Sequence, residues 1–116
     1  MQYMLLIYQD SSRQSMPTSP EEAQKAYAPW MAYTKALRDA GAMISGSQLA
    51  PATAATTVRV SDGRRQVQDG PYADTTEQLA GYYLIEAPDL DAALDWAARC
   101  PGAQSGIMEV RPLVGD

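Results

Sequence analysis

Residues 69–84 of this 116-residue chain read DGPYADTTEQLAGYYL, and they join a tight turn to a hydrophobic strand. Gly70 permits a backbone conformation that residues with a Cβ avoid, while Pro71 fixes its own φ and keeps Gly70 out of the α region. The aromatic and branched residues that follow predict a core strand over 82–87. The segment therefore predicts a glycine turn that leads directly into the core.

Outward from this segment, the chain alternates between strand and helix patterns. One helix should begin at the Ser19 N-cap with Pro20 in its first position and end at Gly41. A second should begin near Asp89 and stop at Pro101-Gly102. Glu77 falls where a short helix, expected after the Gly70 turn, would begin or form its first turn. Further strands are expected over 2–8, 42–49, 56–60, 65–68 and 107–112.

The strands over 56–60 and 65–68 flank Asp62-Gly63, which is a strong two-residue hairpin signal, and this hairpin looks like an insertion. Without it the order is β-α-β-β-α-β, the ferredoxin-like α+β plan, in which the strands over 2–8 and 82–87 lie at the sheet centre. A stripe of residues on the first helix should pack on this sheet, namely Tyr27, Trp30, Met31 and Leu37.

Both central strands are apolar on both faces, because Leu5 alternates with Leu6 and Tyr83 with Tyr82. Helices can cover one face only, and the other face should be polar if it met water. We therefore expect a homodimer in which two sheets pack face to face.

The turn at 69–72 resembles the Asp-Gly-Pro-Phe signature of the YCII-related (YciI-like, DGPF-type) proteins. Segments 3–8, 57–60, 89–91, 96–98 and 109–112 are similar to other recurring blocks of that family, so the resemblance covers nearly the whole chain as one domain, 1–116. It implies a dimeric α+β barrel. The departures are Tyr72 for phenylalanine, Asp74 for glutamate, Thr76 for lysine and Ala80 for glycine, and Thr76 removes a charge.

Composition excludes several kinds of site. The chain has no histidine and one cysteine, so neither a histidine-based catalytic triad nor a metal site built on histidine is available, and we expect no metal and no cofactor. A net charge of −5 disfavours nonspecific binding to nucleic acid. No apolar run approaches the roughly 20 residues that span a bilayer, and residues 1–8 lack signal-peptide character. A cytoplasmic protein with no membrane partner is expected.

The candidate site residues are few. Asp69 is the leading carboxylate: it could orient a ligand or abstract a proton as a catalytic base, or it could simply accept hydrogen bonds from backbone amides within the turn. Glu109 and Arg111 share one face of the last strand, where they either line an inter-sheet cavity as ligand-binding groups or form a surface pair. Tyr72 is a secondary ligand-binding candidate beside the turn.

Other side chains have a structural interpretation beside a functional one. Tyr8, Tyr82 and Tyr83 could stack on a planar ligand or belong to the core. Arg59, Arg64 and Arg65 are expected to form a solvated basic hairpin tip, and Cys100 a structural thiol.

Two classes of function remain open. The first is a small-molecule enzyme or binding protein that holds or transforms a small organic acid in a cavity of the homodimer, as the resemblance to this barrel implies. The second is a noncatalytic regulatory or interaction protein, because family members are often encoded beside, or fused to, extracytoplasmic-function sigma factors.

Overall fold

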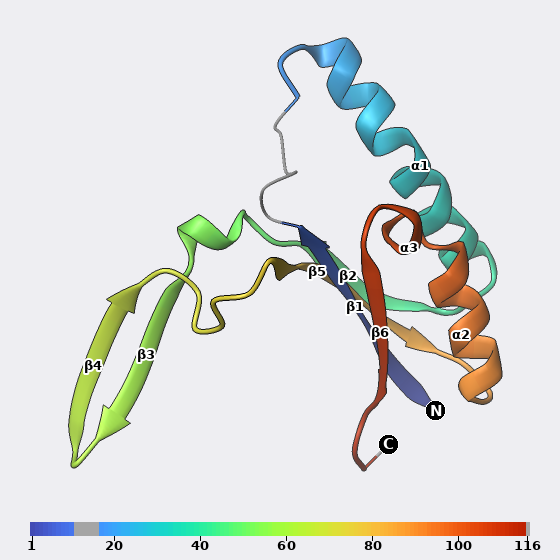
Figure 1. The fold of residues 1–116 in the computed structure, drawn as a ribbon. Helices are drawn as coiled ribbons and strands as arrows, with labels where there is room; N and C mark the ends of the chain where they lie inside the picture. The colour runs from blue at the N-terminus through green and yellow to red at the C-terminus, as the bar shows by residue number, and fades with distance from the viewer. Residues whose placement is uncertain (11–16, 116) are drawn as a thin grey trace.

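A computed structural model describes residues 1–10 and 17–115 of the chain. Its main sheet is antiparallel and has the strand order β2-β5-β1-β6, with the helices on one side and a separate hairpin at the other end of the molecule (Figure 1). These strands are β1 (Gln2–Asp10), β2 (Met43–Gln48), β5 (Glu77–Glu86) and β6 (Ile107–Pro112). The expected ferredoxin-like α+β plan is confirmed, because the first and third core strands, β1 and β5, lie at the centre.

The first helix, α1 (Pro20–Asp39), begins where its capping signals predict. The Ser19 hydroxyl accepts a hydrogen bond from the backbone N–H of Glu22 at 3.1 Å, and Pro20 occupies the first turn. The Glu22 carboxylate accepts hydrogen bonds from the backbone and side chain of Thr18, which lower its pKa. Past its end, Gly41 takes a φ of +71° that suits glycine.

The second helix, α2 (Leu90–Arg99), has Asp89 as its N-cap, whose carboxylate accepts a hydrogen bond from Ala92 N–H at 2.9 Å. As expected, α2 ends directly before Pro101-Gly102, and a separate short helix, α3 (Gly102–Ser105), starts there. Gly102 is required for packing: a Cβ on it would lie 2.9 Å from Ile7 and 3.1 Å from Trp30. The glycine therefore also marks a close contact with the sheet.

The core lies between the helices and one face of the sheet. Its largest fully buried side chains are Leu5, Leu37, Ile85 and Cys100. The expected packing stripe on α1 is wrong in two places, since Met31 is 71% exposed and Tyr27 36% exposed. Tyr33 is buried in their place and packs with Trp30 and Leu37. The i, i+3, i+7 spacing of Trp30, Tyr33 and Leu37 follows the helix period equally well.

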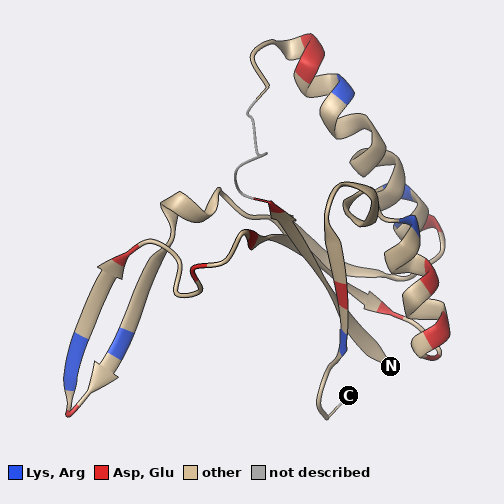
Figure 2. Ribbon diagram, viewed as in Figure 1, with Lys and Arg blue, Asp and Glu red and all other residues tan. Residues whose placement is uncertain are grey.

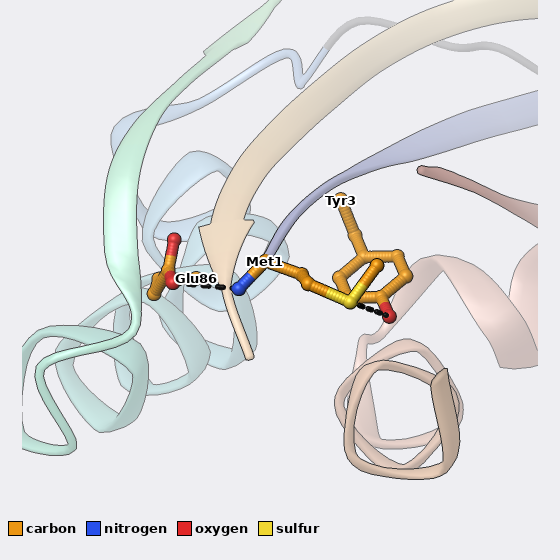
Figure 3. Close-up of polar contacts among 3 residues, drawn as sticks. All are labelled: Met1, Tyr3 and Glu86. Atoms are coloured by element: carbon orange, nitrogen blue, oxygen red, sulfur yellow. Dashed lines mark hydrogen bonds and ion pairs between the residues drawn. The ribbon is translucent and has the colours of Figure 1, made fainter. Parts of the chain in front are cut away.

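Strand β5 starts at Glu77, so the expectation of a short helix at this residue is wrong. Glu77 pairs with Asp10, and the ladder continues to Gln2 opposite Glu86, with a register shift between Ile7 and Tyr8. Beside this last pair, the Met1 ammonium group forms a 2.8 Å ion pair with Glu86, and the Tyr3 hydroxyl contacts the Met1 sulfur (Figure 3). Pairing with a strand about seventy residues away decides the conformation of residues 77–81.

The hairpin consists of β3 (Thr56–Ser61) and β4 (Arg64–Asp69), and it follows the short 3₁₀ helix η2 (Ala52–Ala54). Asp62 and Gly63 both have positive φ, 52° and 74°, as a type I′ turn requires, so the hairpin signal is confirmed. Among the described residues, no helix is long and apolar enough to cross a membrane.

Candidate functional site

The signature turn is fixed at the base of the hairpin. Gly70 has a φ of +100°, which confirms the need for glycine at this position. Its N–H donates to the carbonyl of Ala55 at 2.7 Å, and its carbonyl accepts from the Thr57 hydroxyl at 2.8 Å. These two hydrogen bonds hold the chain as it leaves β4 and determine where residues 71–74 fold.

Residues 71–74 fold beside one face of the hairpin and border an open hollow of about 650 Å³, which we call the signature cavity. The Arg59 guanidinium lies over the Tyr72 ring, 5.9 Å from its centroid, a cation–π contact across the cavity. The cavity is lined by Thr57, Arg59, Gln66, Val67, Gln68, Asp69, Gly70, Pro71, Tyr72 and Asp74. It therefore contains one cation, two carboxylates and an aromatic ring that is 76% exposed.

Asp69 is exposed at the rim of this cavity. Within residues 1–10 and 17–115, its carboxylate accepts no hydrogen bond, so the interpretation of Asp69 as a side-chain acceptor for turn amides is not supported. Gly70 supplies the turn geometry through its backbone instead. The Asp69 carboxylate is left available for a ligand or a proton.

Glu109 and Arg111 lie elsewhere, on the face of the sheet that is turned away from the helices. Glu109 is directly opposite Leu6 and Arg111 is opposite Met4, and directly opposed residues share a face. The same face carries Tyr8, Tyr82 and Leu84, all half-buried. We call this surface the open sheet face: Met4, Leu6, Tyr8, Tyr82, Leu84, Glu109 and Arg111.

The open sheet face combines an ion pair with an aromatic and aliphatic surface. The Arg111 guanidinium pairs with the Glu109 carboxylate, and the Arg111 side chain is 69% exposed. Arginine binds carboxylates through two parallel N–H donors, so an anionic ligand could replace or join Glu109 as its partner. Within the described part of the chain, no protein group hydrogen-bonds to the hydroxyls of Tyr8 and Tyr82, and both can therefore serve a ligand.

The structure groups the four predicted residues into two pairs. Asp69 and Tyr72 line the signature cavity, which contains no residue of β6. Glu109 and Arg111 lie on β6, at the edge of the main sheet, far along the molecule from the hairpin (Figure 1). A single chain therefore does not bring the Asp69 carboxylate and the Arg111 guanidinium to one site.

A polar cluster between α1, α2 and the sheet was not predicted. The Tyr33 hydroxyl donates to the carbonyl of Trp96 at 2.7 Å, and the hydroxyls of Thr34 and Tyr83 are hydrogen-bonded at 2.8 Å. Burial raises the pKa of Tyr33, Tyr83 and Cys100, so these groups remain protonated near neutral pH. The cluster is consequently a set of neutral structural groups, and the helical spacing of Tyr33 to Leu37 was its only sequence signal.

Among the described residues, no three histidine, cysteine or acidic side chains gather where they could hold a metal ion. Charged residues are spread over the chain, with basic residues on the hairpin and acidic ones along α2 and near the strand ends (Figure 2). The signature cavity and the open sheet face are two exposed surfaces of the described residues where polar and aromatic groups converge.

Comparison with known proteins agrees with this architecture. The model of the YCII-related domain family matches residues 1–115. The chain is 42% identical over 115 residues to an uncharacterized protein of Rhizobium meliloti (strain 1021), which covers 97% of this chain and 92% of that protein.

A solved structure with a similar fold is 5-chloro-2-hydroxyhydroquinone dehydrochlorinase (TftG) from Burkholderia phenoliruptrix AC1100, in complex with 2,5-dihydroxybenzoquinone. The TM-score is 0.51 with 16% sequence identity, over 97% of this chain and 93% of that one. At this level of identity the likeness concerns the fold, which is of the dimeric α+β barrel type.

Proposed function

Because the chain belongs to the YCII-related domain family, and its fold is similar to that of an enzyme named for a small organic substrate, we propose that it binds a small organic acid between the sheets of a homodimer. The observation that carries this proposal is the open sheet face. A solvent-exposed arginine stands there beside two tyrosines and three aliphatic side chains that are half-buried in the single chain.

A second sheet placed over this face would bury the aliphatic residues and leave the polar groups around a cavity. Arg111 would pair with the acidic group of the ligand, and the rings of Tyr8 and Tyr82 would contact its body. Ligand sites combine apolar walls and a few polar groups in this way. A planar acid, comparable in size to the 2,5-dihydroxybenzoquinone held by TftG, suits one guanidinium and two aromatic rings.

Chemical transformation of the ligand would require a proton acceptor, and the chain contains no histidine. We propose Asp69 for this role, since its carboxylate is exposed and accepts no hydrogen bond from the described residues. Because Asp69 and Arg111 lie on separate surfaces of one chain, a shared site would need Asp69 from one subunit and Arg111 from the other.

The proposal is tested by titrating the protein with benzoate, maleate and 2,5-dihydroxybenzoquinone while binding is followed by calorimetry. Arg111→Met should weaken binding of the preferred probe by at least about tenfold, because a charge-assisted hydrogen bond is lost. Arg38→Met is the matched control, since Arg38 is an exposed arginine on α1, on the helix side of the sheet. If an intact dimer binds none of the three probes, the interaction class of function gains support.

A further inference from the structure

The β3–β4 hairpin exposes a stripe of valines on one face. Val58 and Val67 are directly opposite each other, and Val60 is the next residue on the same face, opposite Arg65. Their exposed fractions are 60%, 58% and 69% for Val58, Val67 and Val60. We call these three residues the valine face. Strand surfaces that meet only water are normally polar, so an apolar stripe of this kind indicates a surface that is covered in the assembled protein.

The hairpin has little support within its own chain. Its strands pack chiefly on each other and not on the helices or the main sheet. The face opposite the valines is partly covered by residues 71–74, through the contact of Tyr72 with Arg59. The three valines stay exposed, although Val67 also borders the signature cavity. A two-stranded hairpin alone is marginally stable in water, so a further layer is needed on the apolar side.

The shape of the chain indicates where that layer comes from. The radius of gyration is 16.2 Å, whereas a compact domain of this length has about 13 Å. The hairpin projects from the sheet on the side away from the helices (Figure 1). The hairpin and the open sheet face therefore border the same side of the molecule, and anything that covers the open sheet face lies next to the hairpin.

We propose that the valine face docks on a second copy of this chain, so that the hairpin acts as an arm that clasps the partner subunit. The arm contact adds to the sheet-to-sheet homodimer of the proposed function and depends on it. Position favours this occupant, because a second copy that covers the open sheet face also lies beside the hairpin (Figure 1). Beside the valines, this face of the hairpin carries one arginine and one aspartate, Arg65 and Asp69, so its contact with the second copy is chiefly apolar.

The test is the dimer dissociation constant, measured by sedimentation equilibrium. Val58→Asp should raise it by at least about tenfold, because an apolar group in the contact is replaced by a charge. Met31→Asp is the control, since it places the same charge at an exposed apolar side chain of α1, on the helix side of the sheet, and should leave the constant unchanged. The double variant Val58→Thr, Val67→Thr keeps β-branched side chains in both strands and should also weaken the dimer, without loss of the hairpin itself.

Hydrogen exchange gives a second readout of the arm. Amides of residues 56–69 should exchange more slowly above the dissociation constant than below it. Two results together would overturn the arm contact while leaving the sheet-to-sheet dimer intact. These are a dimer of unchanged affinity in Val58→Asp, and arm amides that exchange equally fast at both concentrations. A monomer at all concentrations would overturn both proposals of a dimer. Acid binding is measured separately by calorimetry, so its loss is not confused with either result.

Discussion

Gly106 lies directly against the backbone of Tyr8, so closely that a Cβ on residue 106 would overlap the Tyr8 carbonyl oxygen. This contact joins the end of α3 to β1 immediately before β6 begins. Gly106 has a φ of −160°, which any residue can adopt. The restriction at this position is therefore the lack of space for a Cβ and not the backbone conformation.

Gly106→Ala should lower the free energy of unfolding by at least about 2 kcal/mol, since backbone cannot yield as a flexible side chain can. Urea titration followed by tryptophan fluorescence measures the change. Ser105→Ala, at the preceding exposed position, is the control and should be near neutral. A Gly106→Ala protein as stable as the parent would contradict the close packing of α3 on β1.

Tyr33→Phe tests the polar cluster that sequence reasoning did not identify. The variant keeps the ring, which packs edge to face with Tyr83 and Trp96, but removes the donor to the Trp96 carbonyl. A buried acceptor without a donor costs about 1–3 kcal/mol. Thermal unfolding of Tyr33→Phe should show this loss, whereas Tyr27→Phe, at a partly exposed position on the same helix, should not.

Much of the fold could be predicted because local signals agreed with the tertiary arrangement. Ser19-Pro20, Asp89 and Asp62-Gly63 each specify a backbone geometry within a few residues, and the structure has that geometry at all three places. The start of β5 could not be predicted in this way. Residues 77–81 are extended because they pair with the far end of β1. The local sequence of residues 77–81 does not indicate that this distant strand will pair with them.

The candidate site was less accessible to sequence reasoning. The alternation of residues around Glu109 and Arg111 showed that they share a face, but not which face, and only the pairing of β6 with β1 places them opposite Leu6 and Met4. The grouping of Asp69 with Arg59 and Tyr72 depends on how residues 71–74 fold back on the hairpin. Such contacts arise from tertiary structure and leave no spacing signal in the chain.

The stability of the protein should fall in alkaline solution. Burial raises the pKa of Tyr83 above its ordinary value of 10.0 and that of Cys100 above 9.0, and it raises the pKa of Tyr33 as well. As the pH rises, the unfolded chain therefore loses these protons before the folded protein does. The free energy of unfolding should be fully retained below pH 9 and should decline as the pH rises toward the pKa values of the folded protein. Unfolding titrations between pH 8 and 11 measure the slope, and Tyr83→Phe should make it shallower. A slope that is the same in both proteins would exclude Tyr83 as a source.

The signature turn should depend on Gly70 and hardly at all on the charge of Asp69. A Cβ at residue 70 meets no atom within 4 Å, so the cost of Gly70→Ala arises from a φ of +100° alone and should be about 1–2 kcal/mol. Asp69→Asn should change the free energy of unfolding by less than about 0.5 kcal/mol, because the carboxylate is exposed and supports no hydrogen bond within the described residues. Equal urea midpoints for Gly70→Ala and the parent would refute this account of the turn.

Adjacent residues of β1 should respond in opposite ways to the same substitution. Leu5 is fully buried under the helices, so Leu5→Lys places an unpaired charge in the core and should prevent folding. Leu6 is half-buried on the open sheet face, opposite Glu109, so a single chain can accept a lysine there.

If two open sheet faces pack together, Leu6→Lys should give a folded monomer. Dimerisation would bury the lysine charge under the partner's sheet, which is unfavourable, whereas the core on the helix side is unchanged. Circular dichroism should show parental secondary structure in Leu6→Lys, and light scattering at micromolar concentration should show half the parental mass. A parental protein that is itself monomeric, or a Leu6→Lys protein that still dimerises with unchanged affinity, would contradict packing through this face.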